Sequence, residues 1–310
     1  MIITHTLQMP ALTSRSTCVA LGLFDGLHRG HQAVLQATLS HGAALRLEPL
    51  CFTFSTTLHT PQAKQGMTRL MSLHAMEEQL ARMGFARMVC PDFDEFRTLS
   101  PRRFVEDILI DKLGAAAIVC GFDFRFGRQA AAGVEELSQF CREKNLDLLV
   151  IPAVIEEGEP ISSTRIRELI KAGEMSAANQ MLGRAFSIDF EVVPGRKLGH
   201  TIGWPTINQP FPPDFTLPRF GVYATLTRWG DKQYSSVTNV GVKPTVGSDQ
   251  VLAETYIQDF AGNLYGSRVE VQFLQFLREE MKFPSLDALK GQIAMDADQA
   301  RKIAASFLQK

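Results

Sequence analysis

The chain has 310 residues, and its 32 Lys and Arg against 33 Asp and Glu give a formal net charge of −1. Because domains that hold nucleic acid through its phosphates are usually clearly basic, this balance argues against a nucleic-acid partner. Hydrophobic residues make up 45% and charged residues 21%, which excludes a disordered or fibrous protein and predicts about two globular domains.

The sequence shows no sign of a membrane or secretory segment. No apolar run approaches the roughly 18 residues that a spanning helix needs, and no basic stretch followed by an apolar one opens the chain. The five cysteines are far apart, with no Cys-x-x-Cys pair, which predicts neither a disulfide framework nor a zinc cluster. Four of them lie in apolar stretches that predict buried thiols: Cys18, Cys51, Cys90 and Cys120. We therefore expect a cytoplasmic protein without a membrane partner.

The first half alternates predicted strands with predicted helices. The strands are expected at 18–23, 47–54, 86–90, 116–121 and 146–152, and the helices at 31–39, 70–83, 101–113 and 134–144. This alternation predicts a parallel sheet with crossover helices on its faces. Ligands bind such sheets beyond the carboxyl ends of the strands.

From about residue 186 the pattern changes to short segments of β-branched and aromatic residues. These lie at 187–193, 221–227, 234–240, 253–260 and 268–273, separated by turn signals such as Gly230-Asp231. They predict an antiparallel sandwich or barrel. A final helix is expected at 286–308, broken near Asp296. We predict a domain boundary between residues 184 and 185, which gives domains of residues 1–184 and 185–310.

Residues 19–31 read VALGLFDGLHRGH and carry the first candidate site. Gly26 and Gly30 allow the backbone to approach a bound group, and the helix that follows presents free N–H groups that favour phosphate. His28 and His31 add donors that could stabilise a pentavalent phosphorus. A lone His-x-x-His is more often an ordinary helix start, but its place after a buried strand and a Phe-Asp-Gly turn favours function. Zinc would need a third ligand, and none is apparent nearby.

Two further segments of this half carry candidate residues. Ser163, Thr164 and Arg167 open a predicted helix after Pro160, where capping is at least as good an explanation as phosphate binding. Together with the His-x-Gly-His segment, they resemble the nucleotidylyltransferase superfamily, which is built on a Rossmann-like sheet. Residues 121–127 read GFDFRFG, and their phenylalanines favour equally an apolar strand end and a loop that stacks a planar heterocycle.

The second half carries its own candidates, in a glycine-rich segment and a strand. Residues 195–208 read GRKLGHTIGWPTIN, in which Lys197 and the glycines could wrap phosphates: Gly195, Gly199 and Gly203. Thr206 and Asn208 face one way from an extended segment and offer oxygen ligands that suit Mg²⁺. By itself, an ordinary glycine-rich turn is the simpler explanation.

Glu254 lies in a predicted strand. A strand glutamate is usually an exposed, solvated side chain. Alternatively, it accepts a hydrogen bond from a substrate hydroxyl and directs that oxygen at a γ-phosphate.

Taken together, these ordered motifs resemble the bacterial bifunctional riboflavin kinase/FMN adenylyltransferase (FAD synthetase) family over essentially the whole length. The resemblance rests on LGLFDGLHRGH, GFDFRFG, ISSTRIRELI, GRKLGHTIGWPTIN, VTNVGVKPTVG and ETYIQDF. It implies a Rossmann-like N-terminal domain that transfers AMP from ATP to FMN, giving FAD and pyrophosphate. It also implies a C-terminal β-barrel with a helical tail that makes FMN from riboflavin, with Mg²⁺ and ATP.

The resemblance also implies roles for individual residues. Glu254 would be the base of the kinase, and Thr206 and Asn208 would hold Mg²⁺ and phosphate. ATP phosphates would contact His28, His31, Ser163, Thr164 and Arg167, and the flavin site would be lined by Asp123, Phe124 and Phe126. Small molecules (riboflavin, FMN and ATP) are the expected partners, with flavin-requiring apoproteins as candidates. The sequence does not give the oligomeric state.

Several positions depart from the family pattern. Leu23 stands where Asn is usual, 52–58 lacks the Phe-x-Pro-His-Pro motif, and Met76 replaces a frequent Lys. In the other half, Tyr256 replaces a usual His. The departures of the first half motivate a second hypothesis, a riboflavin kinase whose N-terminal domain is degenerate. A third hypothesis is a flavin-binding regulator without catalytic activity.

Overall fold

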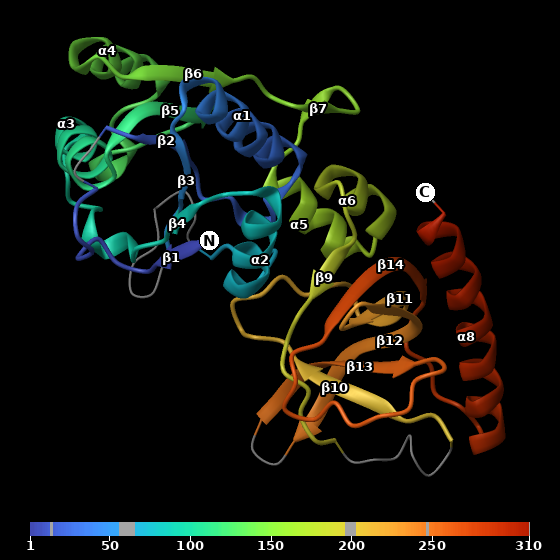
Figure 1. The fold of residues 1–310 in the computed structure, drawn as a ribbon. Coiled ribbons are helices and arrows are strands. Elements are labelled where there is room, and N and C mark those ends of the chain that lie inside the picture. Colours follow the sequence, from blue (N-terminus) through green and yellow to red (C-terminus); the bar gives the residue numbers. More distant parts are fainter. Residues whose placement is uncertain (13–14, 56–65, 196–202, 246–247, 310) are drawn as a thin grey trace. The chain divides into compact units, whose positions relative to one another are not determined.

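The computed structural model describes residues 1–12, 15–55, 66–195, 203–245 and 248–309 (Figure 1). They form two compact units. The first comprises Met1–Met67 and Leu73–Ser162, and the second comprises Thr68–Ser72 and Ser163–Lys310. In the described part of the chain, no helix has the length and apolar character needed to cross a bilayer.

The first unit contains a parallel sheet of six strands in the order β1-β4-β3-β2-β5-β6. In chain order these are β1 (Ile2–Thr4), β2 (Thr17–Leu21), β3 (Glu48–Phe52), β4 (Arg87–Val89), β5 (Ala115–Gly121) and β6 (Asp147–Ile151). The predicted parallel sheet is confirmed; the short, exposed edge strand β1 was not predicted. In chain order, β3 and β4 are added on one side of β2, and the chain then returns to add β5 and β6 on the other side. The crevice for a ligand in such sheets lies at this point of reversal.

Helices fill the crossovers of this sheet: α1 (Arg29–Leu45), α2 (Leu73–Met83) and α4 (Val134–Lys144). The helix expected at 101–113 begins as α3 (Pro101–Arg103) and continues as the π-helix η4 (Phe104–Lys112). Its wider hydrogen-bond spacing is seen where Leu113 N–H donates to the Ile108 carbonyl at 2.9 Å. A short hairpin, β7 (Ile155–Glu156) and β8 (Glu159–Pro160), closes the unit.

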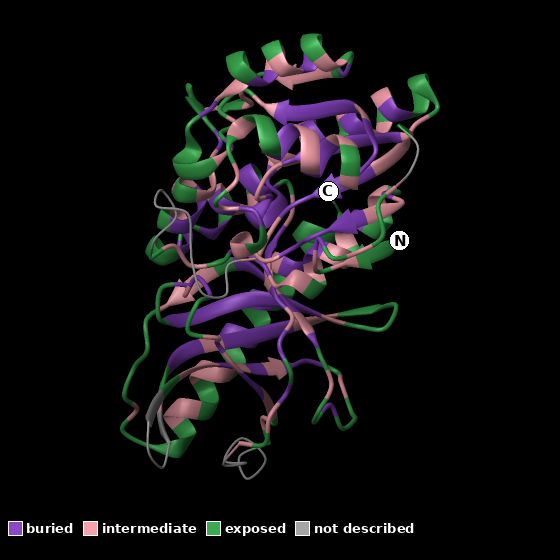
Figure 2. Ribbon diagram, turned by 90° about the vertical axis from the view of Figure 1, so that its left-hand side faces the viewer, coloured by how far each residue is buried: buried purple, intermediate pink, exposed green. Residues whose placement is uncertain are grey.

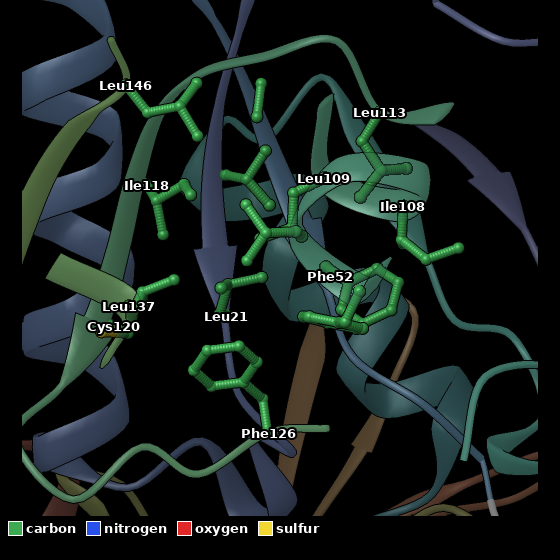
Figure 3. Close-up of a cluster of buried hydrophobic side chains, with 14 of the residues drawn as sticks. Leu21, Phe52, Ile108, Leu109, Leu113, Ile118, Cys120, Phe126, Leu137 and Leu146 are labelled. Carbon is green, nitrogen blue, oxygen red and sulfur yellow. The ribbon is translucent and has the colours of Figure 1, made fainter. Parts of the chain in front are cut away.

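The core of the first unit is apolar. Side chains from the sheet pack against η4 and α4, among them Leu21, Phe52, Leu109, Ile118 and Leu137 (Figure 3). All five cysteines are buried and free, which confirms the burial predicted for four of them and adds Cys141. Burial raises the pKa of the Cys18 thiol to about 11 and that of Cys90 to about 12, so the thiols behave as small hydrophobic groups.

The second unit contains an antiparallel sheet in the order β10-β13-β12-β11-β14-β9. The strands are β9 (Phe186–Ile188), β10 (Thr206–Pro210), β11 (Gly221–Trp229), β12 (Lys232–Thr245), β13 (Ser248–Ile257) and β14 (Glu270–Arg278), and they are preceded by α5 (Ser163–Ala172) and α6 (Met175–Leu182). Beyond β9, Val193 pairs with Asn208 of β10, which turns the sheet toward a barrel. The predicted barrel is confirmed, and Figure 2 shows its strands largely buried.

One face of this sheet buries a chain of hydroxyl groups. The Thr225 hydroxyl lies 2.8 Å from that of Ser236 and 2.9 Å from that of Thr238. Thr227 donates to Ser236, and Thr238 bonds Thr255, both at 2.9 Å. All five side chains are fully buried. Each buried hydroxyl therefore has a partner, which removes most of the cost of its desolvation.

The last helix, α8 (Leu286–Leu308), is continuous, so the predicted break near Asp296 is wrong. Asp296 is buried, and both of its carboxylate oxygens accept hydrogen bonds from Arg278 at the end of β14, the shortest at 2.7 Å. Gln292, one turn earlier in α8, also donates to it. The acid therefore joins the helix to the sheet and does not compete for helix backbone.

Candidate functional sites

The turn between β2 and α1 is strained. Phe24 and Leu27 adopt the left-handed region, with φ of 54° and 42°, and Gly26 does so with φ of 78°. Such a backbone is costly for residues other than glycine, and it persists where the surroundings hold it. Here the Phe24 and Leu27 side chains are fully buried. The sequence predicts the turn but contains no signal for this strain.

This turn delivers the two histidines of the first candidate site. The His28 ring stacks on that of His31, with centroids 3.6 Å apart. His28 also caps α1, because its Nδ1 accepts the His31 backbone N–H at 3.3 Å. An accepting Nδ1 leaves the proton of the neutral ring on Nε2, which remains a donor. A Cβ on Gly30 would lie 3.1 Å from His28 Cε1, so glycine permits this approach.

The helix-opening segment predicted to contact phosphates belongs to the second unit. Ser163 and Thr164 begin α5, and Thr164 is exposed. Arg167 is buried, and its Nε donates to the Thr68 carbonyl at 2.6 Å. His28 and His31 belong to the first unit. Joint action of these histidines and the α5 residues on one ATP molecule stays a prediction.

The aromatic loop after β5 divides into a buried part and an exposed part. Phe126 is buried in the core and packs parallel to Phe124, with centroids 5.7 Å apart. Asp123 and Phe122 are exposed. Phe126 thus fits the apolar explanation of the motif, and the exposed Asp123 lies outside the core. The flavin roles predicted for Asp123, Phe124 and Phe126 stay predictions.

The departures from the family pattern are accommodated without disrupting the fold. The Leu23 carbonyl accepts a hydrogen bond from the buried Thr53 hydroxyl at 2.8 Å. Met76 is buried in α2, where a lysine would need a partner. The residues at 56–58 lie outside the described part of the chain. At Tyr256, the ring packs edge-on against Trp204 at 4.7 Å.

The second candidate site is a row of polar side chains across the barrel. Register places Asn208 of β10 opposite Glu254 of β13, and Glu254 opposite Asn239 of β12. Residues paired in this way point to the same face and lie about 5 Å apart. Thr206, two residues before Asn208, shares that face. Glu254 also pairs with Lys243, whose Nζ lies 2.9 Å from Oε2.

The glycine-rich segment contacts this row at one described position. A Cβ on Gly195 would lie 2.3 Å from Asn208 Nδ2, so any larger residue would have to displace the Asn208 side chain. Gly203 has a φ of 85°, which also favours glycine. Lys197 and Gly199, predicted to wrap phosphates, lie outside the described residues.

The residues of the row fit a magnesium ion better than zinc. Within the described residues, no group of three or more His, Cys, Asp or Glu could hold a metal. Thr206 and Asn208 instead offer neutral oxygen donors beside the Glu254 carboxylate, and Asn208 is buried against Gly195. Mg²⁺ takes few protein oxygens and completes its shell with phosphates and water.

Sequence reasoning found Glu254 and Asn208 separately but missed Asn239 and Lys243. Asn239 lies in a segment predicted as a strand, and its spacing of two residues from Val237 indicates only that the two side chains share a face. Its neighbour across the sheet depends on register, which joins residues far apart in the chain. Register was the missing information.

Comparisons with known proteins cover both units. A family model described as FAD synthetase matches residues 11–165, and one described as riboflavin kinase matches residues 182–304. The bifunctional riboflavin kinase/FMN adenylyltransferase of Listeria monocytogenes is 31% identical over 301 residues, which cover 96% of this chain and 95% of the relative. The protein of the same name from Escherichia coli K12 is 34% identical over 289 residues, 92% of each. A crystal structure named a macrolide-efflux protein from Streptococcus pneumoniae matches with a TM-score of 0.84 at 28% identity, covering 97% of this chain and 98% of that one.

Proposed function

The chain belongs to the bifunctional riboflavin kinase/FMN adenylyltransferase family, and we propose from this premise how its residues divide the two reactions. It is an enzyme that uses ATP to convert riboflavin to FMN and FMN to FAD. Residues 185–310 catalyse the first reaction and residues 1–184 the second. The ranges of the two family models support this division.

In the kinase reaction, Glu254 accepts the proton of the terminal ribityl hydroxyl. That oxygen attacks the γ-phosphorus of ATP, the bond from this phosphorus to the β–γ bridging oxygen breaks, and ADP leaves. Thr206 and Asn208 hold Mg²⁺, which when bound neutralises phosphate charge. The observation that carries this assignment is the register that places Asn208 opposite Glu254.

In the adenylyltransferase reaction, a phosphate oxygen of FMN attacks the α-phosphorus of ATP. The bond to the α–β bridging oxygen breaks, and pyrophosphate leaves. His28, which caps α1, and His31, in the first turn of that helix, stabilise charge on the phosphates near Gly26. The family resemblance implies Ser163, Thr164 and Arg167 as further phosphate contacts. Asp123 and the two phenylalanines beside it, Phe124 and Phe126, bind the flavin.

The kinase-only hypothesis is disfavoured by the extent of the family match. The FAD synthetase model matches residues 11–165, and this range includes Leu23, the segment 52–58 and Met76. The departures therefore fall within a domain that still matches its family. A purely regulatory flavin-binding protein is disfavoured for the same reason, because both matched families are named as enzymes.

Product analysis tests the proposal. The protein is incubated with ATP and Mg²⁺ and either riboflavin or FMN, and the flavins are separated by chromatography. Wild type should yield FMN and FAD. Glu254→Gln should lose FMN formation and keep FMN-to-FAD conversion, whereas the double variant His28→Ala/His31→Ala should do the reverse. Loss of both activities in either variant would contradict the assignment of separate sites.

Location and macromolecular partners remain part of the proposal. A cytoplasmic location is supported by the five free, buried thiols. The net charge of −1 gives no support for a nucleic-acid partner. Apoproteins that require flavin are the partners expected of an enzyme that releases FMN and FAD.

A further inference from the structure

Asn239 has an acceptor without a donor. Its Nδ2 donates to Glu280 Oε1 at 2.9 Å, while its Oδ1 is buried and has no hydrogen-bond partner among the described residues. A buried amide oxygen left in this way costs about 1–3 kcal/mol. The amide therefore keeps one unsatisfied acceptor, which a hydrogen-bond donor would stabilise.

Glu280 determines which atom of the Asn239 amide has no hydrogen-bond partner. A carboxylate only accepts hydrogen bonds, so Asn239 must turn its NH₂ toward Glu280 and its oxygen away. The carboxylate itself is held close to the sheet: a Cβ on Gly241, two residues after Asn239 on the same face, would lie within 2.4 Å of Glu280 Oε1. Glycine at 241 thus leaves room for the acid that orients Asn239.

The charges around Asn239 select the missing donor. Asn239 lies opposite Glu254 and bonds Glu280, so two carboxylates flank it. Lys243 offsets the charge of Glu254, but the Glu280 carboxylate would still repel a phosphate group at this point, and a phosphate offers no proton to donate at neutral pH. A neutral hydroxyl satisfies both requirements. Riboflavin carries several of them on its ribityl chain, next to the one that is phosphorylated.

We propose that Asn239, oriented by Glu280, is a positioning residue of the kinase reaction and accepts a hydrogen bond from a secondary hydroxyl of the ribityl chain. The inference rests on the proposed role of Glu254. With one secondary hydroxyl held at Asn239, the terminal hydroxyl is directed to the neighbouring position in the row, which is Glu254. Asn239 and Glu280 would then select a polyol side chain.

The test compares riboflavin with analogues that each lack one secondary ribityl hydroxyl and keep the terminal one. For wild type, one analogue should lose about tenfold in kcat/KM, the value of one hydrogen bond to a buried acceptor. For Asn239→Ala, kcat/KM for riboflavin should fall by about the same factor, and the penalty for that analogue should disappear. Glu280→Gln should show the same pattern in part, because glutamine can also donate and no longer fixes the amide.

Glu279→Gln is the matched control for Glu280→Gln. Its exposed carboxylate pairs with Arg219, and its replacement should leave kcat/KM unchanged for every substrate. A merely structural role for Asn239 would lower activity equally on riboflavin and on all analogues, and that result would overturn the inference. If Asn239→Ala does not fold, the analogue pattern of Glu280→Gln decides in its place. Kinase activity retained by Glu254→Gln would instead overturn the proposed function, so the two failures are distinguishable.

Discussion

The two units position their functional side chains by different means. In the first, His28 and His31 lie where a turn beyond a strand end enters α1, and left-handed residues and a capping bond hold them there. In the second, Asn208 and Glu254 stand on paired strands, where the backbone ladder itself sets their spacing. A turn can bring groups close together at the cost of strain. A sheet provides fixed distances without strain.

The thiols should produce the largest difference between the two units in the pH dependence of stability, because all five belong to the first unit. Burial raises the pKa of each above its ordinary value of 9.0; Cys18 and Cys141 reach about 11. The folded state therefore prefers the neutral thiol, and this stability is complete below pH 9 and lost as the pH rises toward 11. At pH 10 the loss should be about 1 kcal/mol for a thiol whose pKa is raised to about 11.

Urea unfolding at pH 8 and at pH 10 measures this difference in stability. It is followed through two activities, riboflavin phosphorylation for the second unit and FMN-to-FAD conversion for the first. FMN-to-FAD conversion should fail first. The barrel has no cysteine, and its buried Tyr223, whose pKa is also raised by burial, starts from a higher value of 10.0. Cys141→Ala should remove one thiol's share of the pH dependence. Equal loss of both activities at pH 10 would contradict this prediction.

The buried ion pair should have the next largest effect, on the second unit. Asp296→Ala leaves Arg278 without its partner, which should lower the free energy of unfolding by about 3–5 kcal/mol. Asp298→Ala is the matched control, because that acid is exposed and pairs with Lys302 one turn away on the helix surface. It should cost under about 1 kcal/mol. Denaturation curves of both variants make the comparison, and similar midpoints would count against the role of Asp296.

A methyl group at Gly195 should damage the kinase alone. Gly195→Ala places a carbon within 2.3 Å of Asn208 Nδ2 and must displace that side chain. We expect about a hundredfold loss in kcat for riboflavin, equal to roughly 2.7 kcal/mol. Gly291→Ala is the control, because nothing lies within 4 Å of its Cβ. A Gly195→Ala enzyme with full kinase activity would show that Asn208 is not held at this point.

The corresponding change in the first unit should be milder. Gly30→Ala brings a carbon 3.1 Å from His28 Cε1, a contact that a small ring movement can relieve. FMN adenylyltransferase activity should fall by about tenfold, with riboflavin kinase unchanged. Steady-state rates of both reactions with purified variant provide the measurement. A loss larger than that of Gly195→Ala would contradict the expectation that the turn tolerates an added methyl group better than the sheet.

How much the sequence reveals follows the same division. The alternation of apolar runs predicts the parallel sheet, and a Gly-containing turn before a helix indicates the histidine site. The positive φ of Phe24 and Leu27 escapes prediction, because burial and not residue type imposes it. In the barrel, single residues are recognisable by their chemistry. Their neighbours are not recognisable, because the pairing of Asn239 with Glu254 depends on the register of two strands. In the same way, the role of Asp296 depends on its contact with Arg278 in another element.

The hydroxyl chain inside the barrel has a consequence for spectroscopy. Thr227 donates to Ser236, and one consistent arrangement lets each hydroxyl donate to the next as far as Thr255. Protons sealed in this way exchange slowly with water, whereas surface hydroxyl protons are lost to rapid exchange. Resonances from these threonine hydroxyls should persist in proton spectra of the native enzyme and vanish when the barrel opens. The rate of their disappearance would then report local opening of the barrel.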